Sequence, residues 1–184
     1  MKRLTIHLLL LSPLVFLLAQ LFIFEVNDPI KYIYIVSGIT ATVILFFSIT
    51  ISMIKKHINL MKFRKDIGLF GFFYALLHMV NFIVFDAQLD LSFIIEETLD
   101  KPFIYLGMIA FFILLFMALT STKKLFRKFN KYHRLVYIAL VLITIHFIMA
   151  QKTIALDLFC YIVIIIVIGY YKLLQIIVRN NHVK

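Results

Sequence analysis

Three histidines, His78, His133 and His146, combine residue type and position in a way that could support chemistry. His78 and His146 lie well inside apolar stretches long enough to span a membrane, and His133 lies at the start of one. The hydrocarbon core penalises polar side chains, so a histidine there is a candidate functional residue. Histidines on neighbouring helices of a bundle also hold haem iron. The pattern therefore makes haem binding a candidate function for these residues.

The composition places these histidines in a membrane protein. Of the 184 residues, 64% are hydrophobic, whereas soluble domains contain about 45–50% apolar residues. A helix needs about 20 mostly apolar residues to cross the hydrocarbon core. This criterion predicts six spans, at Leu4–Phe24, Tyr32–Ile54, Ile67–Phe85, Pro102–Thr122, His133–Ala150 and Ile154–Leu174. The loops between them are short, so we expect an all-α integral membrane protein with a single transmembrane domain over residues 1–184.

The distribution of charge predicts the orientation of the bundle. If the N-terminus is cytoplasmic, the cytoplasmic segments contain 16 of the 19 Lys and Arg residues but only one acidic residue, Asp66. The positive-inside rule then predicts an N-in/C-in topology, with both termini in the cytoplasm. The net charge of +10 lies beside the membrane in this arrangement, so it does not indicate nucleic-acid binding.

The depths of two histidines match. His78 lies about eleven residues into the third span, or roughly 17 Å along the helix axis. His146 lies thirteen residues beyond His133, or about 20 Å along the fifth span. Both therefore lie in the outer half of the membrane, where they could be the axial ligands of one b-type haem. The simpler alternative is that each histidine only makes a hydrogen bond to a neighbouring helix.

The third histidine lies at the cytoplasmic edge. Thirteen residues at 100° each rotate about 220°, so His133 and His146 do not share a face of a straight helix. Either the helix is irregular near its start, or His133 faces another group. Arg64, Lys65 and Arg134 are expected beside it, and such a cluster suits a haem propionate, a flavin phosphate or a reduced quinone. We expect electrons to enter the protein here, although a plain positive-inside loop explains the charges equally well.

The remaining features are less specific. His7, His57 and His182 lie near chain ends or loop edges and are expected to be structural. The loop Asp86–Lys101 alternates apolar and acidic residues, which predicts an amphipathic segment at the outer interface. There is no Cys-x-x-Cys-His motif for covalent haem attachment, and no room for a nicotinamide-binding domain. If the chain transfers electrons, we expect them to come from membrane quinol or from a separate cytoplasmic reductase.

Three blocks of sequence carry a resemblance to a known family. They are RKDIGL (64–69) with YALLH (74–78), KPFIYLGM (101–108) with ALTST (118–122), and YHRLVY (132–137) with IHF (145–147). In order and spacing they resemble the MsrQ family, the haem-binding membrane subunit of the bacterial protein-methionine-sulfoxide reductase system. That family belongs to the ferric-reductase-like transmembrane group. The likeness covers a core from about Gly38 to Lys172.

The resemblance implies a cofactor set, partners and a role. His78, His133 and His146 correspond to haem-associated histidines of the family, which binds haem b and also FMN; no residue here is assigned to FMN. Family members pass electrons from the quinone pool, or from a cytoplasmic flavin reductase, across the bacterial inner membrane. The acceptor is a periplasmic molybdopterin-containing catalytic subunit that reduces methionine sulfoxide in oxidised periplasmic proteins. The chain would be the electron-transfer subunit, and its partner would reduce the substrate.

Two other functions stay open. A ferric or other small-acceptor transmembrane reductase would share the haem and differ only in the acceptor. A small transporter or proton channel would use the histidines as a relay and carry no haem. That class usually requires intramembrane carboxylates, and only Asp157, at the outer edge of the sixth span, comes close.

Overall fold

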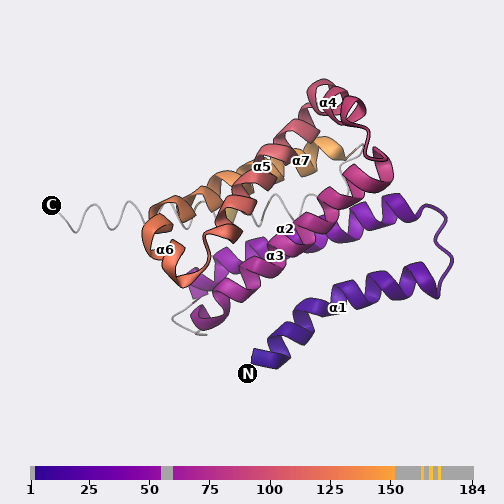
Figure 1. The fold of residues 1–184 in the computed structure, drawn as a ribbon. Helices are drawn as coiled ribbons and strands as arrows, with labels where there is room; N and C mark the ends of the chain where they lie inside the picture. The colour runs from indigo at the N-terminus through magenta and orange to yellow at the C-terminus, as the bar shows by residue number, and fades with distance from the viewer. Residues whose placement is uncertain (1–2, 55–59, 152–162, 164–165, 168–169, 171–184) are drawn as a thin grey trace.

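The computed structural model describes residues 3–54 and 60–151, together with residues 163, 166, 167 and 170. The described secondary structure is entirely helical (Figure 1). The α-helices are α1 (Arg3–Phe22), α2 (Pro29–Ile54), α3 (Arg64–Val80), α4 (Leu91–Asp100), α5 (Pro102–Leu119), α6 (Lys123–Phe129) and α7 (Leu135–Ala150).

Five stretches of the described chain are long and apolar enough to cross a membrane. They run over Arg3–Phe22, Pro29–Ile51, Met61–Asp86, Pro102–Leu119 and Lys123–Ala150. The first five predicted spans are therefore confirmed as helices of spanning length. The sixth predicted span, Ile154–Leu174, lies outside the described residues except for four isolated positions, so the count of six and the position of the C-terminus stay predictions.

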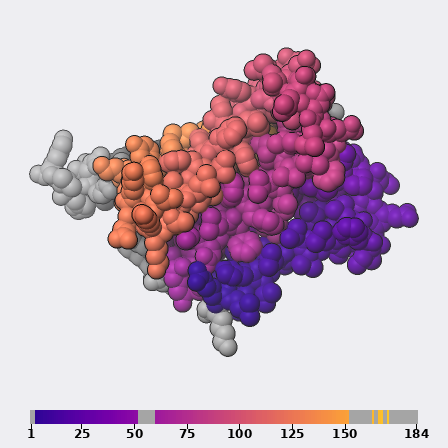
Figure 2. Space-filling view, viewed as in Figure 1, coloured from indigo at the N-terminus to yellow at the C-terminus, as the bar shows by residue number. Residues whose placement is uncertain are grey.

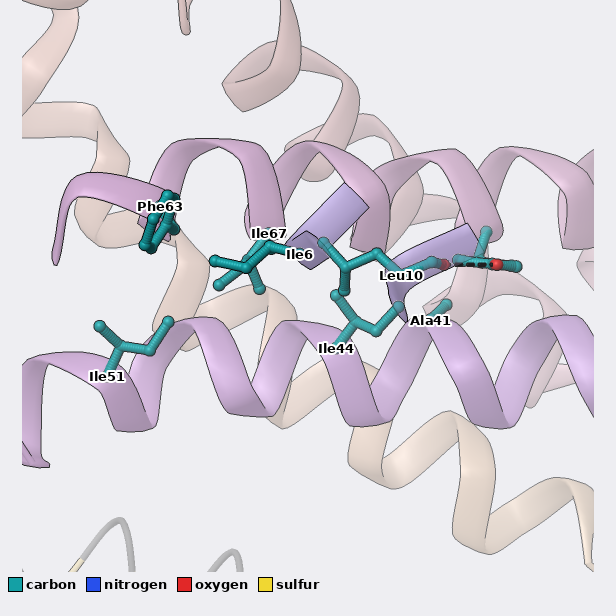
Figure 3. Close-up of a cluster of buried hydrophobic side chains, with 8 residues drawn as sticks. Ile6, Leu10, Ala41, Ile44, Ile51, Phe63 and Ile67 are labelled. Carbon is teal, nitrogen blue, oxygen red and sulfur yellow. Dashed lines mark hydrogen bonds between the residues drawn. The ribbon is translucent and has the colours of Figure 1, made fainter. Parts of the chain in front are cut away.

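Two helical hairpins form the body of the molecule, and α1 lies along one edge of it (Figures 1 and 2). One hairpin pairs α2 with α3, and the other pairs α5 with α7. Helix α2 contributes to both apolar cores. The first core joins α1, α2 and α3 through Ile6, Leu10, Ala41, Ile44, Ile51, Phe63, Ile67 and Tyr74 (Figure 3). The second joins α2, α5 and α7 through Leu45, Phe46, Ile49, Leu114, Val136, Ala139 and Leu140.

Helix α1 is tied to α3 at the position of its proline. Pro13 has no N–H, so the carbonyl of Leu9 loses its helical partner and accepts instead from Ser12 Oγ at 2.8 Å. At Leu10 and Leu14, the hydroxyl of the fully buried Tyr74 takes part in the backbone hydrogen bonding of α1. It donates to Leu10 O at 2.8 Å and accepts from Leu14 N at 3.1 Å. Tyr74 of α3 thus makes hydrogen bonds to the backbone of α1 beside Pro13 and joins the two helices.

The two ends of the bundle differ in charge. One end, the basic end, holds the start of α1, the starts of α3 and α7, and the whole of α6. Its described charged side chains are basic apart from Asp66: Arg3, Lys62, Arg64, Lys65, Lys123, Lys124, Arg127, Lys128, Lys131 and Arg134. The opposite, acidic end holds Glu25, Asp28, Asp86, Asp90, Glu96, Glu97 and Asp100, with Lys31 and Lys101. The fold therefore separates the charges as the positive-inside rule requires, and the orientation in the membrane stays a prediction.

Two spans contain irregular helix. After α3 the chain forms a π-helix over Asn81–Asp86, and before α7 it forms a 3-10 helix over Asn130–Arg134. The irregular start expected as one explanation for His133 is thus present. The acidic loop folds as α4, which Asp90 caps by accepting from Ser92 N, and its apolar side chains are exposed as an amphipathic segment requires.

Candidate haem-binding site

His78 of α3 and His146 of α7 face each other across the two hairpins. Their ring centroids are 6.1 Å apart, and the ring planes are nearly perpendicular at 88°. The proximity expected from their matched depths is therefore found. We refer to these two residues as the paired-histidine site.

A backbone carbonyl of the neighbouring helix holds each ring in the same way. His78 Nδ1 lies 3.2 Å from Tyr34 O on α2, and His146 Nδ1 lies 2.6 Å from Phe103 O on α5. Because a carbonyl only accepts hydrogen bonds, Nδ1 carries the hydrogen in both rings and donates it. The neutral ring then has an unprotonated Nε2 with a free lone pair. Metal-binding histidines are typically held by this arrangement.

A glycine of the same neighbouring helix lies against each ring. A Cβ atom on Gly38 would lie 3.0 Å from His78 Nδ1, and one on Gly107 would lie 2.9 Å from His146 Nδ1. Each glycine follows the carbonyl residue by four positions, so one helical turn supplies both the acceptor and the space. The fold therefore builds the same histidine support twice, once in each hairpin.

The sequence contains a trace of this duplication. Gly38 precedes His78 by 40 residues, and Gly107 precedes His146 by 39. A search for conserved periods along the chain misses it, because one pair of residues per hairpin is a weak repeat. The near-equal glycine-to-histidine spacing is the signal that could have found both glycines.

The geometry of the pair fits a haem. A metal–imidazole bond of about 2.0–2.1 Å, with roughly 1.1 Å more from nitrogen to ring centroid, puts two trans imidazole centroids about 6.3 Å apart. The observed 6.1 Å agrees with that value. No group of three or more metal-ligating side chains occurs in the part of the chain that the structure describes. Two imidazoles alone suit an iron whose other ligands come from a macrocycle.

The paired-histidine site is connected to the acidic end. The ring of Tyr34 meets His78 edge-on at 5.2 Å, and its hydroxyl donates to Asp86 Oδ2 at 3.1 Å. Asn81, three residues after His78, is 1% exposed and donates from Nδ2 to Ile30 O at 3.0 Å. Polar groups thus run from the site to the π-helix and the loop beyond it.

His133 is held differently. Its Nε2 lies 3.1 Å from Thr120 Oγ1 at the end of α5, and the ring of Phe126 meets it edge-on at 4.7 Å. The Thr120 hydroxyl also lies 2.8 Å from Phe116 O, to which it donates, so its oxygen accepts from His133 Nε2–H. Nδ1 of His133 is then the nitrogen with the free lone pair, the reverse of the paired-histidine site.

The predicted basic cluster around His133 is partly assembled. The guanidinium of Arg64 lies close enough to His133 to interact with it electrostatically. Lys65 and Arg134 are exposed, and no contact among the described residues joins either of them to the His133 ring. Of the other histidines, His57 and His182 lie outside the described residues. His7, expected to be structural, is half-buried and faces Asp66.

Comparison with known proteins bears on the same region. A family model described as the ferric reductase like transmembrane component matches residues 55–145, which include His78 and His133 and end one residue before His146. Proteins from Brucella ovis, Brucella canis and Brucella suis, each named protein-methionine-sulfoxide reductase heme-binding subunit MsrQ, are 36% identical over 132 residues. This alignment covers 68% of the chain and 60% of each relative's own length. No solved structure matches the chain.

The helices and the matched region define the class of protein: a multi-pass membrane protein with a ferric-reductase-like transmembrane component. Within this class, the chain is a homologue of the haem-binding subunit MsrQ, as the three sequence blocks predicted. The chain spans about 60% of the length of the relatives that it matches.

Proposed function

We propose that this protein is a b-type cytochrome subunit that carries electrons across the bacterial inner membrane. The observation that carries the proposal is the paired-histidine site, in which two imidazoles face each other at 6.1 Å with Nδ1 of each ring held by a carbonyl. The proposal agrees with the names of the relatives, which describe haem-binding subunits.

The protein's own residues would hold and orient the cofactor. His78 and His146 are the proposed axial ligands, and Nε2 of each ring would bind the iron. The carbonyls of Tyr34 and Phe103 fix the tautomer and make Nε2 more basic. Gly38 lets the ring of His78 pack directly on the backbone of α2, and Gly107 does the same for His146 on α5. The bound haem would supply one-electron chemistry, with its potential set by the two ligands and by burial.

The proposed path runs from the cytoplasmic side to the periplasmic side. Electrons would come from the quinone pool or from a cytoplasmic flavin reductase. They would leave at the acidic end to a periplasmic molybdopterin-containing enzyme that reduces methionine sulfoxide in oxidised proteins. The names of the relatives support this acceptor, since they belong to a protein-methionine-sulfoxide reductase. The orientation rests on the charge separation between the two ends.

The basic cluster is the proposed place where a water-soluble donor delivers electrons. Arg64, Lys65 and Arg134 offer positive charge beside His133 at the basic end. Guanidinium and ammonium groups bind phosphate through charge-assisted hydrogen bonds. A reduced flavin such as FMN, which carries a phosphate, fits this chemistry, and so does a haem propionate.

The alternative acceptor is a ferric chelate or another small molecule, which the name of the matching family model favours. The two functions separate in one experiment. The purified protein, reduced with a quinol, is mixed with ferric citrate or with a periplasmic methionine-sulfoxide reductase and oxidised peptide. On the proposed function, haem reoxidation is fast only with the reductase and its peptide. Fast reoxidation by ferric citrate alone would favour the ferric reductase, and a protein without a haem spectrum would exclude both.

A further inference from the structure

A pocket of about 260 Å³ lies between α1 and α3 at the basic end of the bundle, on the side away from α7. It is lined by His7 of α1 and by Asp66, Leu69, Phe70 and Phe73 of α3. The four α3 residues recur at positions i, i+3, i+4 and i+7, so they form one face of the helix. The lining is therefore an apolar, aromatic wall that ends in a carboxylate and an imidazole.

The polar end of the pocket is held in place. Arg3 binds Asp66 with both nitrogens of a fork, at 2.8 Å from Nε to Oδ2 and 3.1 Å from Nη2 to Oδ1. His7 Nε2 lies 3.4 Å from the same Oδ2, and its ring is 5.6 Å from the ring of Phe70. Only 12% of the Asp66 side chain is exposed, whereas 37% of the His7 side chain is.

The apolar end of the pocket is held too. Tyr74, next to the lining residue Phe73, contacts that ring edge-on at 5.3 Å and makes the two hydrogen bonds to Leu10 and Leu14 of α1. Helices α1 and α3 are thus tied together on both sides of the pocket, by Arg3 and Asp66 at one end and by Tyr74 at the other. The opening between these ties is a built feature of the fold.

The pocket and the basic cluster around His133 lie on different sides of α3. Arg64, which interacts with His133, and Asp66, which lines the pocket, are two residues apart, or about 200° around the helix. A ligand in the pocket therefore contacts α1 and the outer edge of the bundle. A ligand at the cluster contacts α6 and the start of α7.

The chemistry of the pocket selects a class of ligand. Its walls are hydrophobic and aromatic, which suits a flat ring, and its volume is slightly below the roughly 300–1,000 Å³ of sites for drug-sized ligands. The imidazole of His7, oriented by a carboxylate that is ion-paired with Arg3, can accept a hydroxyl proton. The helix that carries the wall is a membrane span, so the ligand can arrive through lipid. These features together describe the ring of a lipid-soluble quinol whose tail stays in the bilayer.

We propose that the pocket between α1 and α3 is a quinol-oxidation site, with His7, oriented by Asp66, as the proton acceptor. This inference rests on the proposed function, because it needs a haem that accepts the electrons. The quinol breaks two O–H bonds, gives its two protons one after the other to His7, which releases each to the cytoplasm, and leaves as the quinone. Its two electrons leave one at a time: the first would reduce the ferric haem iron, and the second would follow after the haem has passed the first to the acceptor. Phe73 lies five residues before His78, about 7.5 Å along the α3 axis.

The first test is binding, which does not depend on electron transfer. The purified full-length protein is labelled in detergent with a photoactivatable azido-quinone, and the labelled peptides are identified by mass spectrometry. We expect labels on residues around His7 and on the α3 segment from Asp66 to Phe73. Competition by a natural quinone should remove them. Labels confined to the segment from Lys123 to Arg134 would overturn the proposal.

The second test is kinetic. We expect His7→Ala and Asp66→Asn to slow quinol-driven haem reduction by about a hundredfold, at the low end of what a positioned proton acceptor contributes. Haem content and the extent of dithionite reduction should match the unaltered protein. Leu8→Ala is the matched control, because Leu8 neighbours His7 but is 60% exposed. The His7 variant leaves the Arg3–Asp66 ion pair intact. A slow rate in this variant therefore cannot be attributed to the loss of that pair, which could unfold the Asp66 variant.

The outcomes separate this site from the function on which it rests. If quinol reduces the haem of both variants at the unaltered rate, the pocket is not the quinol site, although the proposed function stands. If quinol does not reduce the haem of the unaltered protein but reduced flavin does, the pocket assignment fails and the flavin reductase is the donor. If the purified protein contains no haem, the proposed function fails first.

Discussion

The paired-histidine site and His133 use the same side chain but expose opposite ring nitrogens. In the paired-histidine site, carbonyls take Nδ1–H of both rings and leave Nε2 free. At His133, the Thr120 hydroxyl occupies Nε2 and leaves Nδ1 free. The first site is built from backbone carbonyls and glycines, and the second from the Thr120 hydroxyl, the exposed ring of Phe126 and the charge of Arg64.

This difference teaches how to separate the roles of histidines in a membrane bundle. A backbone carbonyl cannot change its hydrogen-bonding role or rotate, so it fixes the tautomer and direction of a ring, as a metal ligand requires. A hydroxyl can rotate and can donate or accept, so it tolerates a change in the protonation of its partner. His78 and His146 are therefore suited to hold a group, and His133 is suited to exchange protons or electrons with one that comes and goes.

The largest expected effect is loss of haem when a paired histidine is removed. His78→Ala and His146→Ala each delete a proposed ligand, which should weaken haem binding by more than the 10–100-fold typical for an outer-shell partner of a metal ligand. Haem per polypeptide, measured after purification in detergent, checks this. Leu76→Ala is the control, since Leu76 lies on α3 two residues away and is exposed. Full haem content in both histidine variants would remove the ligand assignment.

The glycines should show the next largest effect. Gly107→Ala places a methyl group 2.9 Å from His146 Nδ1, and Gly38→Ala places one 3.0 Å from His78 Nδ1, so either ring must move. Overpacking of this kind costs about 1–3 kcal/mol, or about 5- to 150-fold in haem affinity. The matched control is Gly68→Ala on α3, where the nearest atom to the new methyl, Ser48 Oγ, is 3.5 Å away.

Gly68→Ala should keep its haem and gain up to about 1 kcal/mol of helix propensity. Haem affinity measured by titration into the apoprotein compares the three variants. Equal affinity in all of them would mean that the close approach of the rings to α2 and α5 has no role in holding the cofactor.

A selective effect is expected at the basic end. His133→Ala should retain the haem between His78 and His146 but slow its reduction by reduced flavin. The variant lacks the imidazole beside Arg64 that can exchange protons or electrons with the flavin. Dithionite should reduce the haem as before. Stopped-flow absorbance follows both reactions. Thr120→Val is the milder variant, because it removes the hydroxyl but keeps the His133 ring. Its rate of flavin-driven haem reduction should lie between those of the unaltered protein and His133→Ala. Flavin-driven reduction at the unaltered rate in both variants would leave these residues with a topological role alone.

The smallest effect is expected at Tyr34. Tyr34→Phe removes the hydrogen bond to Asp86 but keeps the carbonyl that holds His78. We expect unchanged haem content and a loss of about 1 kcal/mol of stability, as for one ordinary hydrogen bond. Thermal denaturation of the haem spectrum measures it. Haem loss as large as in His78→Ala would mean that the side chain of Tyr34, rather than its backbone, supports the site.

The sequence was sufficient to predict the first five spans and the proximity of His78 and His146. Long apolar runs define membrane helices well, because the bilayer thickness fixes their length. Depth along a helix then follows from residue number, since every residue rises by about 1.5 Å. At any one depth, a small bundle has only a few helices, so two inward-facing residues at the same depth lie close together. Their proximity could therefore be predicted without knowing the helix contacts.

The sequence did not predict what holds the rings. The carbonyl acceptors carry no residue-type signal, because every residue has one. Gly38 and Gly107 are informative only once α2 is known to face α3 and α5 to face α7, across about 40 residues of sequence. The partner of His133 depends on the 3-10 helix before α7, which changes the direction of the ring. His7 was expected to be structural because it lies near the chain end, and its contact with Asp66, 59 positions away, carries no signal in the sequence.

The most direct test of the central claim is the low-temperature electron paramagnetic resonance spectrum of the oxidised, detergent-purified protein. Two imidazole ligands on one iron give a low-spin ferric haem, and loss of either ligand gives a high-spin one. We predict a low-spin signal in the unaltered protein that becomes high-spin in whatever haem His78→Gly or His146→Gly retains. Added imidazole, which can fill the space of the missing ring, should restore the low-spin signal in both variants. A low-spin signal that survives either substitution without added imidazole would contradict the claim that His78 and His146 bind one haem together.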